Sequence, residues 1–140
     1  MRHKGLINSY KVTDMKKLYP LIGSLILFAA AYFGGLIQTF TLAHPWWYKN
    51  ATLVGGAIGI AIALILIWYR NHNAKTTNKI EILLGGALLI VLYVDYTAGR
   101  TFIDSDIFEA RAGKIWHYGY HTSVALFIPT AAALIRKFIK

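Results

Sequence analysis

The chain alternates long apolar stretches with short polar ones. The apolar stretches cover residues of about 20–43, 52–69, 80–98 and 116–138. A helix of about 20 apolar residues is long enough to cross the hydrocarbon core of a bilayer. The pattern therefore predicts an all-α protein, with residues 1–140 forming a single integral membrane domain built as a four-helix bundle.

The polar stretches predict the connections between these helices. A basic tail is expected over 1–19, against anionic headgroups, and a longer outward loop over 99–115. Pro20 is expected to begin the first helix, where its missing N–H costs nothing. Pro129 falls inside the last helix and is expected to bend it.

Positive charge is distributed unevenly over these connections. Of the 15 Lys and Arg residues, eleven fall in the tail, the 70–79 connection and the C-terminus, and four fall on the other side. The positive-inside rule then predicts cytoplasmic N- and C-termini in a multi-pass protein of the cell membrane. Because the basic residues flank apolar spans, the net charge of +9 indicates lipid rather than nucleic acid as the partner. With no cysteine, disulfides and thiolate metal sites are excluded.

Small residues recur at positions where helices can pack closely. Gly55, Gly59 and Ala63 are spaced by four residues and fall on one helix face. Gly34 and Gly85 give further points of close approach. Packing within the chain and contact with another membrane subunit both fit this pattern.

Candidate chemistry is concentrated between residues 95 and 123. His117 and His121 are four residues apart, so they fall on the same face of a helix. Asp104 or Asp95 can supply a carboxylate, and two imidazoles with one carboxylate suit copper, zinc or iron. These four residues are the predicted metal ligands.

A second interpretation treats the same segment as structural. Asp95 is then expected to pair with Arg100, and Asp104 with Arg111, which ties the outward loop down. Asp95 stands out in either case, because an ionisable residue within an apolar helix is a candidate for function. A proton relay is a third interpretation.

The passage LYVDYTAGRTFIDSDIFEARAGKIWHYGYHTSVALF resembles part of the C subunit of archaeal ammonia monooxygenase and its particulate methane monooxygenase relatives. In that family an aspartate and two histidines bind copper, and the resemblance matches them to Asp104 (or Asp106), His117 and His121. It covers about a quarter of the chain. The interval between acid and histidine is longer here, and the histidine spacing differs. The cysteine-free composition is also similar to that of membrane proteins of ammonia-oxidising archaea, whose complexes carry small accessory membrane subunits.

These features lead to one expected function and two alternatives. The expected function is a non-catalytic accessory or structural subunit of a larger membrane complex. The resemblance implies an ammonia-monooxygenase-type copper complex, so the enzyme would be a copper-dependent monooxygenase. The first alternative is a membrane enzyme with an outward-facing His/Asp site for copper or another divalent metal. The second is a small channel or transporter, against which the scarcity of polar residues in the spans argues.

Overall fold

A computed structural model of the protein describes residues 3–42, 44 and 46–139, with side chains from residue 15 onward. All regular structure in these residues is helical, which confirms the all-α prediction. The five helices are α1 (His3–Phe33), α2 (Leu36–Thr41), α3 (Tyr48–Arg70), α4 (Ala74–Asp104) and α5 (Ala110–Phe138). The side chains of residues 1–14, which belong to the expected tail, lie outside the described part, and so does Lys140 at the other end of the chain.

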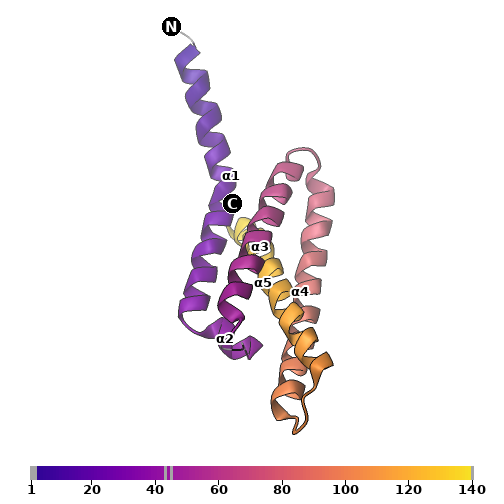
Figure 1. Ribbon diagram of the computed structural model, residues 1–140. Helices are drawn as coiled ribbons and strands as arrows, with labels where there is room; N and C mark the ends of the chain where they lie inside the picture. The colour runs from indigo at the N-terminus through magenta and orange to yellow at the C-terminus, as the bar shows by residue number, and fades with distance from the viewer. Residues whose placement is uncertain (1–2, 43, 45, 140) are drawn as a thin grey trace.

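The helices α1, α3 and α4 all pack against α5 (Figure 1). The α3–α4 turn and the end of α5 lie at one end of the molecule, together with the long N-terminal part of α1, which extends beyond the other helices (Figure 1). We call this the basic end. At the other end, called the α2 end, lie α2 and the α4–α5 connection (Figure 1).

Among the residues that the structure describes, three helical segments are long and apolar enough to cross a membrane. They are Met15–Phe33, Tyr48–Arg70 and Ala74–Asp104. Large apolar side chains such as Leu83 and Leu89 are exposed on α4, which is the arrangement expected of a helix in contact with lipid. These segments indicate a bilayer environment.

The expected span 116–138 lies within α5, and α5 is not among those three segments. Its polarity explains why. The helix carries two histidines, and Arg136 and Lys137 fall in its last turn. Helix α5 packs against α1, α3 and α4, but several of its polar side chains stay exposed, including Lys114 and Lys137.

The first apolar stretch differs from the prediction at both ends. Pro20 lies inside α1 rather than at its start, since the helix already begins at His3. Near the other end, the stretch is interrupted where Gly35 adopts a left-handed conformation with φ of 75°. Glycine adopts this conformation without steric cost, so the chain turns there into the short helix α2. The predicted end of the span at Ala43 lies outside the described residues.

The outward loop is much shorter than the predicted 99–115. Helix α4 continues to Asp104 and α5 begins at Ala110, so only residues 105–109 connect them. Helix α4 continues through Gly99. The missing side chain at this position leaves room for the ring of Trp116. A Cβ at position 99 would lie 2.9 Å from the Trp116 Nε1 atom. Arg100 and Asp104 also pair across one turn at 3.0 Å, which favours continued helix.

The small-residue face of α3 packs against α5. A Cβ at Gly55 would lie 2.7 Å from the carbonyl oxygen of His121, and one at Gly59 would lie 2.8 Å from that of Ala125. Residue 129 is proline, so the Ala125 carbonyl lacks its usual helical N–H donor. The α3 backbone approaches α5 at the point where Pro129 leaves this carbonyl free.

The remaining small residues of the predicted packing set have different surroundings. Ala63 is buried in a cluster with Leu21 and Ile128. A Cβ at Gly85 would make only ordinary contact with Thr130, whereas Gly34 is exposed and follows the end of α1, where a Cβ would meet the carbonyl of Ala30. Among the predicted packing residues, the closest approach to another helix is therefore at Gly55 and Gly59 of α3.

Candidate functional site

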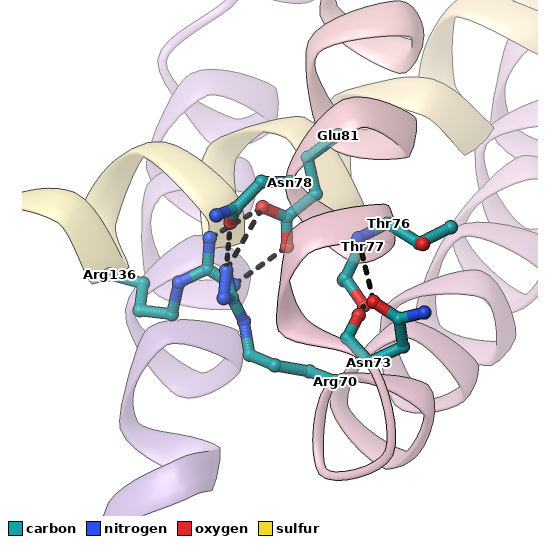
Figure 2. A network of polar contacts seen from close by, with 7 residues as sticks. All are labelled: Arg70, Asn73, Thr76, Thr77, Asn78, Glu81 and Arg136. Carbon is teal, nitrogen blue, oxygen red and sulfur yellow. Dashed lines mark hydrogen bonds and ion pairs between the residues drawn. The ribbon is translucent and has the colours of Figure 1, made fainter.

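Glu81 is the centre of a polar network at the basic end of the molecule (Figure 2). Its side chain comes from α4 and is only 6% exposed. The guanidinium of Arg136, on α5, donates from Nη1 to Oε1 at 2.7 Å and from Nη2 to Oε2 at 2.5 Å. Two parallel charge-assisted bonds of this kind fix both the distance and the orientation of the pair.

Arg70 brings a third helix into the network. Its Nη2 atom lies 3.5 Å from Oε2 of Glu81 and also donates to the side-chain oxygen of Asn78. Asn73 caps the start of α4 by accepting a hydrogen bond from the backbone N–H of Thr76 at 3.0 Å (Figure 2). The network therefore connects the end of α3, the start of α4 and the end of α5.

The sequence pattern alone does not identify this network. It indicates only that Glu81 is a carboxylate near the positive end of a helix, and it predicts no site in residues 70–79. Glu81 and Arg136 are 55 residues apart, so no local motif contains both. The informative pattern is an acidic residue inside an apolar helix, at the end where the topology also gathers basic residues.

The four predicted metal ligands do not all lie in one place. His117 and His121 do lie together, with ring centroids 4.6 Å apart. The Nδ1 atom of His121 lies 2.8 Å from the carbonyl oxygen of His117, so this nitrogen is engaged within the helix. The ring of His117 packs edge-on against Trp47 at 4.7 Å.

Asp95 contacts a different face of α5. Its side chain is fully buried, and a Cβ at Gly119 would lie 2.9 Å from its Oδ1 atom. Position 119 is two residues from both histidines, which on a helix is about 200° around the axis. Both carboxylate oxygens are buried and have no hydrogen-bond partner among the described residues. The predicted pair of Asp95 with Arg100 does not form.

Asp104 lies in a third place, at the exposed end of α4. It pairs with Arg100 at 3.0 Å rather than with Arg111, and both side chains are more than half exposed. In the part of the chain that the structure describes, no group of three or more His, Asp or Glu side chains is arranged to hold a metal ion. The aspartates are thus separated from the two imidazoles.

Aromatic side chains surround the histidines at the α2 end. The ring of His44 stacks on Trp47 at 5.8 Å, with an angle of 6° between the planes, and lies 5.6 Å from Trp116. The indole N–H of Trp116 donates to the carbonyl of Thr41 at 2.9 Å, which fastens α2 to α5. His44 therefore joins the aromatic packing near His117.

No family model, characterised protein or solved structure matches the chain.

Proposed function

We propose that the protein is a non-catalytic structural subunit of a larger membrane complex. The observation that carries this proposal is that charged side chains of the protein join its helices to one another. Glu81 is bound by Arg136 and Arg70, which joins three helices through one carboxylate. A buried group held by two cations is suited to fixing helices rather than to exchanging ligands.

The distribution of apolar surface supports the same proposal. In an 18-residue apolar stretch of Met15–Phe33 and of Ala74–Asp104, 17% and 22% of the residues are buried within the chain, compared with 39% in such a stretch of Tyr48–Arg70. Helices α1 and α4 thus present most of their apolar surface outward, to lipid or to other membrane helices. We include α5 as a fourth membrane-crossing helix, with both termini in the cytoplasm, in accordance with the positive-inside rule.

The proposal is tested by purifying the full-length chain in mild detergent from the cells that produce it. Stoichiometric membrane partners are expected to remain bound. The resemblance of residues 92–127 to a C-subunit segment makes a copper monooxygenase of the ammonia-oxidising type the first complex to search for. Recovery of the chain without partners would contradict the proposal.

A membrane metal enzyme is the second candidate, favoured by the proximity of His117 and His121. It is tested by the metal content of the purified protein and of a His117→Ala/His121→Ala variant. His72→Ala is the matched control, because His72 is an exposed histidine at the basic end. A metal lost in the double variant and kept in the control supports this function, and equal metal content in all three proteins excludes it.

A further inference from the structure

A cavity of about 370 Å³ opens at the basic end, beside the Glu81 network. Ligand pockets begin at about 300 Å³, so this volume suits a small group rather than a whole cofactor. Helices α1, α3, α4 and α5 all contribute to its lining. The cavity is therefore a site that forms only when the four helices are packed together.

The charged groups of the cavity are mostly positive. Four cationic side chains and one carboxylate line it, which gives a formal charge of +3: Lys16, Lys17, Arg70, Arg136 and Glu81. Glu81 compensates part of the charge of the two arginines. The buried Nε atom of Arg70 has no hydrogen-bond partner among the described residues. The site thus has an excess of positive charge and an unused donor.

The rest of the cavity wall is largely apolar, with Leu66, Ile67 and Ala132 among its residues. Lys16 and Lys17 precede the apolar part of α1, and Arg70 ends α3, so the cavity lies where the apolar helix surface gives way to polar residues. In a bilayer this is the level of the lipid phosphates. Basic pockets between membrane helices on the cytoplasmic side bind anionic headgroups in this way.

We propose that this cavity binds a negatively charged phosphate group, with Lys16, Lys17 and Arg70 supplying the donors. The group comes either from an anionic phospholipid, whose acyl chain then lies along the apolar wall, or from a soluble phosphate that enters from the aqueous side. The proposal is independent of the subunit function, because it requires only the packed chain in a membrane.

The first experiment uses the full-length protein in nanodiscs of phosphatidylcholine, with and without phosphatidylglycerol. Lipid retained by the protein is measured by native mass spectrometry, and Tm is measured in parallel. The Lys16→Gln/Lys17→Gln variant is expected to lose affinity for phosphatidylglycerol by about tenfold or more, since each lysine near an anionic headgroup contributes substantially to binding. A Lys16→Arg/Lys17→Arg variant is expected to retain it.

The matched control removes the same charge at the same end of the molecule. Lys75 and Lys79 are exposed and do not line the cavity. A Lys75→Gln/Lys79→Gln variant is therefore expected to change the affinity by less than about twofold, because exposed charges at a distance are screened by salt.

The second arm distinguishes the two sources of phosphate. Inorganic phosphate is titrated against the protein in nanodiscs of phosphatidylcholine alone. A rise in Tm that the Lys16→Gln/Lys17→Gln variant lacks assigns the site to soluble phosphate, and an effect of phosphatidylglycerol alone assigns it to lipid. The proposal is overturned if both double variants lose affinity equally, or if neither phosphate source has an effect that depends on Lys16 and Lys17.

Discussion

Arg136 on α5 binds both carboxylate oxygens of Glu81 on α4, with donor–acceptor distances of 2.7 and 2.5 Å. The pair is largely buried, whereas the Arg100–Asp104 pair at the α2 end is exposed by 53% and 54%. Burial decides how much each pair contributes, because a charge left without its partner is costly only where water cannot reach it. The contributions of a buried and an exposed ion pair to stability can thus be compared within the same protein.

Glu81→Gln is expected to lower the free energy of unfolding by about 3–5 kcal/mol, because it leaves the partly buried guanidinium groups of Arg136 and Arg70 without their carboxylate. Arg136→Gln is expected to cost less, because Arg70 still lies 3.5 Å from Glu81. Arg136→Lys is expected to restore only part of this loss, since an ammonium group lacks the planar fork that meets both oxygens. Thermal unfolding in detergent measures the effect.

The control for this prediction is Asp104→Asn, which breaks the exposed pair. Its expected cost is below about 1 kcal/mol. If Glu81→Gln cost no more than Asp104→Asn, the Glu81 network would not have the structural role assigned to it.

Alanine at Gly55 or Gly59 is expected to destabilise the protein by about 1–3 kcal/mol, because an added methyl group would overlap the α5 backbone. The carbonyl oxygens would lie 2.7 and 2.8 Å from the new Cβ atoms. Gly56→Ala is the matched control, since a Cβ at position 56 would have nothing within 4 Å. Alanine favours helix over glycine by about 1 kcal/mol, so the control is expected to be at least as stable as the parent chain. Equal losses at all three positions would contradict the close approach of α3 and α5.

These two features differ in how far the sequence predicted them. The glycine face of α3 was predicted because its period of four residues is a local property of one helix. The Glu81–Arg136 pair was not, because it depends on how α4 and α5 are rotated about their axes. The separation of Asp95 from His117 could not be predicted for the same reason. The spacing placed the two histidines on one face, but only the packing shows that Asp95 meets the opposite face, at Gly119.

The extent of the α4–α5 connection also required tertiary information. The sequence predicted that a loop begins at residue 99. In the structure α4 continues through Gly99, and the missing side chain at this position provides space for Trp116. The sequence could not show which neighbour occupies that space.

Asp95→Asn is expected to leave Tm unchanged or to raise it. Both oxygens of Asp95 are buried without a hydrogen-bond partner among the described residues, and an isosteric amide removes the ionisable group without creating a cavity. Differential scanning fluorimetry in detergent measures the change. A fall of several degrees would show that the carboxyl group has a partner beyond these residues, such as a metal ion or another subunit.

The chain contains no cysteine, so single-cysteine variants report topology without background labelling. Ala74 and Ala110 are exposed and begin α4 and α5. With the basic end in the cytoplasm, a membrane-impermeant maleimide is expected to label Ala110→Cys in intact cells and Ala74→Cys only after the membrane is opened. Labelling of both positions from outside would contradict an odd number of crossings between them.

The central claim is that the chain is a subunit of a larger membrane complex. Native mass spectrometry of the full-length protein, extracted in mild detergent from the cells that produce it, tests this claim most directly. The account predicts an assembly that contains other membrane chains in fixed stoichiometry with this one. A spectrum that shows only the 15.7 kDa chain, or only copies of it, would contradict the account.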